Sequence, residues 1–503
     1  RNNFAPRFGF SWDPKGDGKM AIRGNYGIFF DRSVGATTSL ADGNTPGFAD
    51  TSGNTNPNAN GADFRASTAG LPLPQHGAAP AITPPDNRVA SIVVFNPNLA
   101  TGYVHQYSLT IQRQLWRSNV IETGYVGSRG VKLFYDRDIN QPQAYSSGFL
   151  SAFQQLQTFC SSTTGTTCTG AAPPTTNTLV KLFGTPAAAV TGVGGLTTVQ
   201  QGLLGTAVNN VDRSTATIAK YSAAGLSDFY LRPFPQFNQV IYGSNEGRSY
   251  YDSFYVTMRR TAGDLRYQFN YTWSKNIALE PISTDGNGFT QPLDNFNLLL
   301  DKSRSSADHP HNFNWSAIYS FPWGRGKRFG ANVPRWVDTV SGGWELGVLG
   351  VWQSGNPFTI SSGRATGPST SNTTINYSGD RNIGAVTSSG AGVFFFTPAQ
   401  IAALTDVANE PPAGFVGSSG LFAFRGPHFF NSDVSLVKRF KFTERFSTTF
   451  RAEAYNVFNN VNFQNPAATI TTPSTFGKIS NDFGPGGSGA SGRILQLALR
   501  IDF

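Results

Sequence analysis

The chain has 503 residues, of which 14% are charged and 13% are aromatic, and it contains 55 glycines and 30 prolines. This abundance of aromatic, Gly, Ser, Thr and Asn residues favours strands joined by polar loops and disfavours helical bundles. The formal net charge of +9 is spread along the chain without a block of like charges. It therefore does not indicate the clustered basic face of a nucleic-acid-binding protein, and it leaves anionic lipid head groups or an acidic ligand open.

No apolar run approaches the roughly 18 residues that a membrane helix needs, so any membrane span must be made of strands. The chain opens on Arg1-Asn2-Asn3, without an initiator Met or a signal peptide. We therefore expect a piece of a longer precursor whose export signal lies upstream.

Segments of about ten residues in which apolar and polar residues alternate recur along the chain. Such alternation is typical of strands with one face against lipid and the other towards a polar lumen. It predicts strands near 4–12, 19–30, 103–115, 119–128, 249–259, 265–274, 311–321, 343–353, 429–441, 446–458 and 493–503. In the last of these, one face carries only apolar residues: Leu495, Leu497, Leu499, Ile501 and Phe503.

The connections between these strands alternate between short and long. Short ones are 14–18, 116–119, 261–264 and a turn near Thr443-Glu444, and 322–342 is of middling length. Long ones lie near 31–102, 129–248, 275–310, 354–428 and 459–492, and the two longest could hold further strands or small helices. Outer-membrane barrels have short periplasmic turns and long extracellular loops, whereas a soluble sandwich has no reason to place every long loop at one end.

These features predict an all-β fold, an antiparallel transmembrane β-barrel. The last strand follows a long loop, so it runs from the outside to the periplasm. About eleven strands, an odd number beginning with a descending strand, cannot close a single-chain bacterial barrel by themselves and fit the second half of a larger one.

The tryptophans agree with the predicted ends of the strands. Trp12, Trp116 and Trp323 lie beside predicted periplasmic turns, and Trp273 and Trp352 lie near predicted outer ends. Aromatic girdles are expected at both membrane interfaces, because amphipathic rings favour the head-group layer. The alternative is that they are ordinary core tryptophans.

Four polar residues of the last two strands, Arg451, Glu453, Gln496 and Arg500, are predicted to face the lumen. There they would contact a plug, tune the selectivity of an open pore, or satisfy one another across strands.

The only two cysteines, Cys160 and Cys168, lie in a Ser/Thr/Gly stretch. In an oxidising compartment they would close a small loop disulfide, and the alternative is two free surface thiols.

Several segments resemble TonB-dependent receptors, specifically the Oar-like branch. They are NFAPRFGFSWDPKGDGKMAIRGNYGIFFDR (3–32), QYSLTIQRQLWRSNVIETGYVGSRG (106–130), DKSRSSADHPHNFNWSAIYSFPWGRGKRFG (301–330), RAEAYNVFNNVNFQNP (451–466) and ALRIDF (498–503). The intervening loops carry no resemblance that identifies a ligand.

The resemblance implies the outer membrane of a Gram-negative bacterium and a barrel of about 22 strands around an N-terminal plug, of which this chain would supply the second half. It also implies a TonB box ahead of the plug, which couples the plug to TonB, and a preceding carboxypeptidase-regulatory-like domain. None of these N-terminal parts is within this sequence. Phe503 matches the C-terminal aromatic residue that the barrel-assembly machinery recognises, and outer-membrane lipid and an unknown extracellular ligand complete the expected partners.

Catalytic and metal-binding interpretations find little support. The segment from Ser305 to His311 suggests a Ser/His/Asp set, but neighbours on an extended chain point to opposite sides, so Asp308 cannot easily orient His309. His309 and His311 lack an evident third metal ligand. Residues 13–18 loosely resemble a calcium loop but hold Lys15 and lack a closing Glu, which favours a hairpin turn. The Gly-rich stretch 484–492 indicates a flexible outer loop. We expect no enzyme, cofactor or metal.

Two functions therefore stand. In the first, outer loops capture a ligand that is imported when TonB moves the plug. In the second, a structural or adhesive barrel binds surfaces or polymers through its loops without transport. The aromatic stretches 228–230 and 394–396 are candidate ligand contacts on the loops, because barrels display their recognition surfaces there.

Overall fold

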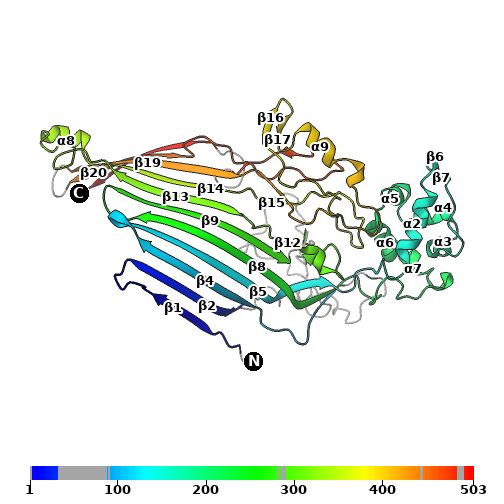
Figure 1. Ribbon diagram of the computed structural model, residues 1–503. Helices are drawn as coiled ribbons and strands as arrows, with labels where there is room; N and C mark the ends of the chain where they lie inside the picture. Colours follow the sequence, from blue (N-terminus) through cyan, green and yellow to red (C-terminus); the bar gives the residue numbers. More distant parts are fainter. Residues whose placement is uncertain are drawn as a thin grey trace, which may run out of the picture.

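The computed structural model describes residues 3–31, 88, 91–279, 283–284, 290–441, 446–483 and 492–503. Its main element is a 13-stranded sheet in which all strands except β3 and β12 follow one path of antiparallel neighbours (Figure 1). The path runs β1 (Arg7–Trp12), β2 (Met20–Phe30), β4 (Tyr103–Gln114), β5 (Asn119–Asp138), β8 (Val240–Arg260), β9 (Leu265–Leu279), β13 (His311–Ser320), β14 (Trp344–Gln353), β19 (Phe429–Lys441), β20 (Ser447–Tyr455) and β22 (Ile494–Asp502). At its side, β3 (Ile92–Phe95) lies parallel to β8, and β12 (Lys302–Arg304) pairs with β9.

The eleven strands predicted from alternation correspond to the eleven strands of this path, and most begin and end close to the predicted residues. Three strands are longer than predicted. β5 continues to Asp138, β8 begins at Val240, and β9 continues to Leu279, so the loops assigned to 129–248 and 275–310 are shorter than expected.

The alternation fails in these extensions for a physical reason. Register shifts interrupt the β5–β8 ladder between Gly130 and Leu133 and between Leu133 and Tyr135. Tyr135 and Ile241 are buried under the loops. A strand covered by protein has no lipid face, so it loses the period-2 pattern that marks the rest of the sheet.

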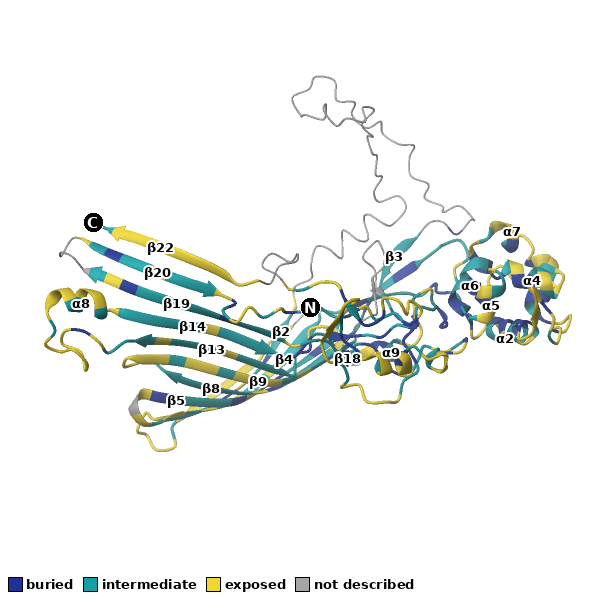
Figure 2. Cartoon of the chain, turned by 90° about the horizontal axis from the view of Figure 1, so that it is seen from above, coloured by how far each residue is buried: buried dark blue, intermediate teal, exposed yellow. Residues whose placement is uncertain are grey.

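The register gives the sheet one polar and one apolar face. On β9, Gln268 and Asn270 pair with Ser316 and Asn314 of β13, while Tyr267, Phe269 and Tyr271 pair with Ala317, Trp315 and Phe313. Hydrogen bonds link the polar face from strand to strand, as between Arg23 and Gln112 or Thr257 and Asn270. Figure 2 shows that buried residues gather at one end of the molecule, whereas the strands are mostly half-buried or exposed. The sheet itself has no interior core.

Aromatic rings lie flat over glycines of the neighbouring strand. Phe10 pairs with Gly24, Tyr107 with Gly127, Tyr255 with Gly124, and Trp315 with Gly350. At each of these glycines an added Cβ would lie within 3.0 Å of the ring that covers it. A glycine leaves room for the ring and the ring covers its exposed backbone, which fixes the register of the pair.

Long and short connections leave from opposite ends of the sheet (Figure 1). At the long end, residues 139–239, here called the helical unit, fold into short helices and one small hairpin. These are α2 (Phe149–Phe159), the hairpin β6 (Thr163–Thr164) and β7 (Thr167–Cys168), α3 (Thr178–Phe183), α4 (Pro186–Gly192), α5 (Leu196–Gln200), α6 (Leu204–Arg213), α7 (Thr215–Ile218) and the 3-10 turn η2 (Ser222–Ala224).

Local sequence explains how these helices start. The Asn177 side chain accepts hydrogen bonds from the backbone N–H groups of Leu179 and Val180, and Thr185 caps α4 ahead of Pro186. Their apolar faces form one core, which includes Phe149, Phe153, Leu156, Leu179, Val208, Val211 and Tyr221. The prediction that the loop 129–248 could hold further strands or small helices is thus confirmed, whereas most of the loop 31–102, for which the same was predicted, lies outside the described residues.

A second packed region, here called the Phe loop unit, spans residues 354–428 and 456–483. It contains β15 (Pro357–Phe358) paired with β18 (Phe424–Arg425), a small sheet of β16 (Thr387–Ser389), β17 (Gly392–Phe394) and β21 (Lys478–Ile479), α9 (Pro398–Leu404) and η4 (Val407–Asn409). Its core is rich in phenylalanine: Phe358, Phe395, Phe396, Phe424 and Phe476. Between the units, β10 (Ser283–Thr284), β11 (Thr290–Gln291) and η3 (Leu298–Asp301) follow β9.

Among the described residues, the opposite end carries short connections: the turn after β1, η1 (Trp116–Ser118), residues 261–264 between β8 and β9, and the segment with α8 (Arg335–Ser341). The predicted turn near Thr443-Glu444 lies outside the described residues. In the part of the chain that the structure describes, no helix is long and apolar enough to cross a membrane.

Candidate ligand pocket

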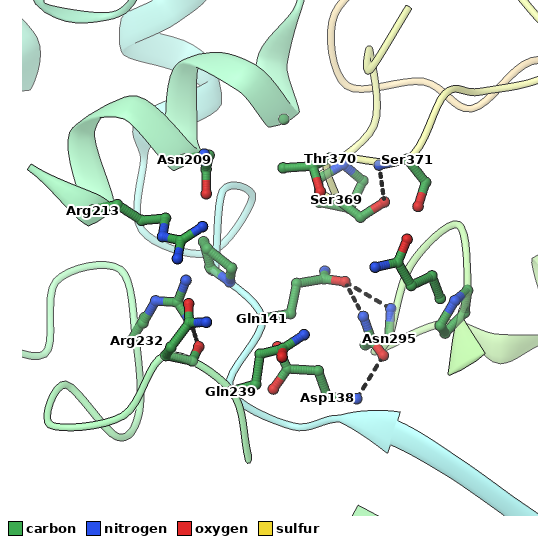
Figure 3. A pocket seen from close by; sticks show the side chains of 16 residues that line it. Asp138, Gln141, Asn209, Arg213, Arg232, Gln239, Asn295, Ser369, Thr370 and Ser371 are labelled. Carbon is green, nitrogen blue, oxygen red and sulfur yellow. Dashed lines mark hydrogen bonds between the residues drawn. The ribbon is translucent and has the colours of Figure 1, made fainter. Parts of the chain in front are cut away.

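A pocket of about 250 Å³ lies at the long-loop end of the sheet, where the helical unit meets the Phe loop unit (Figure 3). Its walls come from segments far apart in sequence: the end of β5, helix α6, the approach to β8, and the loops around 291–295 and 368–371. Arg213 and Arg232 lie on one side, and Ser369, Thr370 and Ser371 lie on the other. The pocket therefore exists only because the two loop units pack together.

Backbone contacts hold these units close. The Gly205 N–H in helix α6 donates a hydrogen bond of 2.9 Å to the Ala365 carbonyl. A Cβ added at Gly205 would lie 1.9 Å from the Ser369 carbonyl oxygen. Only glycine permits this approach, so it brings the 368–371 loop against the helix and closes one wall of the pocket.

Hydrogen bonds fix the carboxamides of the floor. The Gln141 Oε1 atom accepts from the Asn295 backbone N–H at 2.9 Å and from its Nδ2 at 2.7 Å. Asn295 Oδ1 accepts from the Asp138 backbone N–H at 2.8 Å, and Gln141 Nε2 donates to Asp294 Oδ1 at 2.9 Å. Side chains held in this way keep their geometry before a ligand arrives.

The two guanidinium groups of the pocket differ in what they can offer a ligand. Arg232 is buried, pairs with Asp212, and donates to the carbonyls of Asn140 and Asn238. Asp212 is also paired with the buried Arg88, so its charge is shared. Arg213 is exposed and forms no ion pair with any residue that the structure describes. Arg213 is therefore the cation that can bind an acidic group.

The chemistry of the pocket follows from this lining. Asn209 and Gln239 offer amide donors and acceptors and Thr370 offers a hydroxyl. The amides of Gln141 and Asn295 and the hydroxyl of Ser369 are engaged in bonds within the protein and give the walls a fixed polar surface. No aromatic ring is among the described residues that line it. Such a surface binds through hydrogen bonds rather than stacking, and it fits a hydroxyl-rich ligand with one acidic group. No local motif marks these residues, so the sequence analysis did not identify them.

The predicted girdle tryptophans lie at the two ends of the sheet. Trp12, Trp116 and Trp323 are exposed at the short-turn end, and Trp273 is exposed towards the long-loop end. Trp352 is half-buried one residue before β14 ends. Three further tryptophans, Trp315, Trp336 and Trp344, were not predicted to belong to a girdle, and Trp336 is the most exposed of them.

The four residues predicted to face the lumen share one face. Glu453 pairs with Gln496 and Thr449 with Arg500, while the Arg451 Nη1 atom lies 3.4 Å from Glu453 Oε1. Through the register, this is the polar face of the sheet. Arg500 forms an ion pair of 2.8 Å with Asp502, so ion pairs within the polar face engage both arginines and Glu453.

Cys160 and Cys168 are joined by a disulfide that closes the β6–β7 hairpin onto the end of α2. Cys160 is part of the core of the helical unit. The structure therefore places the two sulfurs in a bond and not in separate surface thiols.

His309 and His311 form hydrogen bonds with other residues. His309 Nδ1 lies 2.9 Å from the Ser354 carbonyl, and His311 Nδ1 lies 2.8 Å from the Tyr271 hydroxyl. Asp308 accepts from Arg425 and from the Asn276 backbone N–H, both at 2.7 Å, so its carboxylate does not orient His309. Among the described residues there is no group of three or more side chains placed to hold a metal ion.

The turn after β1 confirms the hairpin interpretation. Asp13 accepts hydrogen bonds from the backbone N–H groups of Lys15 and Gly18, and Gly16 and Gly18 have positive φ. These bonds hold the pKa of the Asp13 carboxyl below its ordinary value. Gly-rich residues 484–491 lie outside the described residues.

The aromatic stretch 394–396 was wrongly predicted to contact ligand. Phe395 and Phe396 are buried in the core of the Phe loop unit, with the Phe396 ring stacked on Phe476 at 5.6 Å. A loop of this length needs its own apolar core, and these rings supply it. In the stretch 228–230, Phe229 is exposed, whereas Tyr230 packs against the core of the helical unit.

An antiparallel sheet with one aromatic face, one polar face, short turns at one end and large loops at the other defines the class of outer-membrane β-barrels. The sequence matches the family model of the outer membrane beta barrel domain over residues 1–496, and the chain belongs to this family. It is a protein of the outer membrane.

Solved structures with a similar fold include the outer membrane transporter YddB from Escherichia coli, at 10% identity, covering 99% of this chain and 40% of that one, with a TM-score of 0.44. The FrpB iron transporter from Neisseria meningitidis (F3-3 variant) is 9% identical over 99% of this chain and 39% of its own, with a TM-score of 0.37. The pyoverdine outer membrane receptor FpvA from Pseudomonas aeruginosa PAO1 is 9% identical, and the match covers 100% of this chain and 36% of FpvA, with a TM-score of 0.37. The chain thus spans about two fifths of the length of these proteins or less. No curated protein matches it.

Proposed function

We propose that the chain is the C-terminal half of a TonB-dependent receptor of the Oar-like branch, which imports a polar, hydroxyl-rich ligand with an acidic group. The pocket between the two loop units carries this proposal, because its carboxamides are held in place while Arg213 is left without an ion pair among the described residues. Loops that only adhered to a surface would need no preorganised concave site.

The edges of the sheet support the barrel part of this proposal. In the described residues, β1 and β22 each pair on one side only, and strand edges within a membrane need to be paired or covered. We propose that preceding strands close these edges into a barrel of about 22 strands, with the polar face towards a plug and the long loops outside. Phe503 would be read by the barrel-assembly machinery, and TonB would act through the plug.

Uptake by cells separates transport from adhesion. Cells producing the full-length parent protein would receive a labelled acidic oligosaccharide, with a neutral oligosaccharide of the same length for comparison. We expect accumulation of the acidic probe that is lost when TonB is absent, and weaker binding by Arg213→Gln. Surface binding without accumulation, equal with and without TonB, would support the adhesive alternative instead.

A further inference from the structure

Three cationic side chains stand on the apolar face of the sheet, away from the pocket. Arg129 on β5 pairs in register with Tyr250 of β8, and Lys275 on β9 pairs with Asp252 of β8. Tyr125, Phe254 and Trp273 alternate with the polar face in the same strands and so share this side. Lys302 on β12 joins them, because its Nζ atom lies 5.1 Å from the centre of the Tyr250 ring.

Trp273 indicates where these cations lie relative to the membrane. This tryptophan pairs with Phe254, and Lys275 lies two residues further towards the long loops, which is roughly 7 Å along a strand. Trp273 has 59% of its surface exposed. A ring of this kind marks the boundary of the hydrocarbon layer, so the cations just beyond it lie at the level of lipid head groups.

Among the described residues, the cluster holds one carboxylate, that of Asp252, and it already has partners. Arg129 Nη2 donates to both oxygens of Asp252, at 2.8 and 2.9 Å, and the Tyr125 hydroxyl donates to Asp252 as well. The Arg129 guanidinium also lies over the rings of Tyr107 and Tyr250. Lys275 and Lys302 are exposed, and neither forms an ion pair within 4.0 Å among the described residues. Three cations and one anion leave the cluster with a net positive charge.

A soluble ligand reaches the loops and the lumen, and not the lipid-facing side on which this cationic cluster lies. Arg129 is held by Asp252 and by the Ser128 and Tyr251 carbonyls, so the two lysines are the cations left for a ligand. We infer that Lys275 and Lys302 bind the phosphate of a phosphorylated glycolipid in the outer leaflet, with the tyrosine rings packed against its sugar and upper acyl chains. Like-charged lysines flanking an aromatic floor supply charge complementarity to an anionic head group. The assignment of the outer leaflet rests on the orientation given under the proposed function.

Binding of lipid A tests this directly. The full-length protein would be purified without endogenous lipid and titrated in neutral-lipid nanodiscs with bisphosphorylated lipid A and with dephosphorylated lipid A. The wild-type protein should prefer the phosphorylated form, and Lys275→Gln/Lys302→Gln should weaken its binding by about 30-fold. Inorganic phosphate at the same concentration should not compete, because it lacks the sugar and acyl contacts.

Arg113 provides a matched control. It is an exposed cation on the same apolar face, but at the short-turn end of β4. Arg113→Gln should bind lipid A as the wild type does, and all variants should keep the heat-dependent gel mobility of a folded barrel. Equal binding of both lipid A forms, or unchanged binding by the double lysine variant, would overturn the inference. Ligand uptake is measured separately, so a failure of transport would not be confused with a failure of lipid binding.

Discussion

The ring of Trp315 on β13 covers its register partner Gly350 on β14, and a Cβ added at Gly350 would lie 2.0 Å from the Trp315 ring. Gly350→Ala should therefore push the ring off the sheet or separate the strands. We expect a loss of about 1–3 kcal/mol, typical of overpacking. The measurement is the temperature at which the full-length barrel loses its fast gel mobility.

Gly9→Ala is the control for this experiment. An added Cβ at Gly9 meets only the Gly24 carbonyl oxygen, at 3.6 Å, which is ordinary contact. It should leave the transition temperature nearly unchanged. Equal effects of the two substitutions would show that ring packing over Gly350 does not stabilise the sheet.

Asp212 holds together the base of the helical unit. It is fully buried between Arg88 and Arg232. Asp212→Asn should leave two buried guanidinium groups without a counter-charge, at a cost of about 3–5 kcal/mol. Faster hydrogen exchange in α2 to α7, with the strands unchanged, is the expected result. Asp228→Asn, at an exposed position in the same unit, should have no such effect.

Asp301 should make the stability of its loop depend on pH. Burial, with repulsion from Asp294 as a smaller cause, raises the pKa of its carboxyl from 3.8 to about 7. Within the described residues its Oδ2 atom has no hydrogen-bond partner. The folded loop thus keeps a proton that the unfolded chain has released, so stability falls as pH rises from about 4 to about 7.

Hydrogen exchange of residues 291–304 would measure this effect. Exchange should be slower at pH 5 than at pH 8 after correction for the intrinsic rate. Asp301→Asn, which mimics the protonated acid, should remove the difference. A loop equally protected at both pH values would show that Asp301 is not protonated in the folded protein.

The disulfide should stabilise the helical unit alone. Replacing both Cys160 and Cys168 by Ser removes a short covalent loop, which we expect to cost about 2 kcal/mol. The proteolysis rate within 139–239 should rise, while the heat-dependent mobility of the barrel should stay the same. A change in barrel mobility would mean that the helical unit and the sheet unfold together.

The sheet could be predicted because successive residues of a membrane strand face lipid and the polar side in turn, so that apolar and polar side chains alternate. Leu495 and Gln496, or Phe269 and Asn270, show this alternation in the sequence itself. Beyond the membrane this alternation is no longer required. The predicted ends of β5, β8 and β9 were therefore wrong. Tyr135 and Ile241 there are buried by protein on the loop side.

The loops could not be predicted in the same way. Phe395 and Phe396 look like exposed ligand contacts in sequence, but they meet Phe358 and Phe476 in a core assembled from distant segments. The pocket is equally non-local, because Gln141 reaches Asn295 across about 150 residues. A local sequence pattern does not predict a contact between residues so far apart in the chain.

Comparing the gel mobility of boiled and unboiled outer-membrane fractions would show whether the full-length protein forms a closed barrel. A closed barrel resists detergent until it is heated, because every strand edge is paired. We expect a fast-moving unboiled species in the outer-membrane fraction that shifts on boiling. The same mobility in both samples would mean that the edges of β1 and β22 remain uncovered in the full-length protein and that the barrel is not closed.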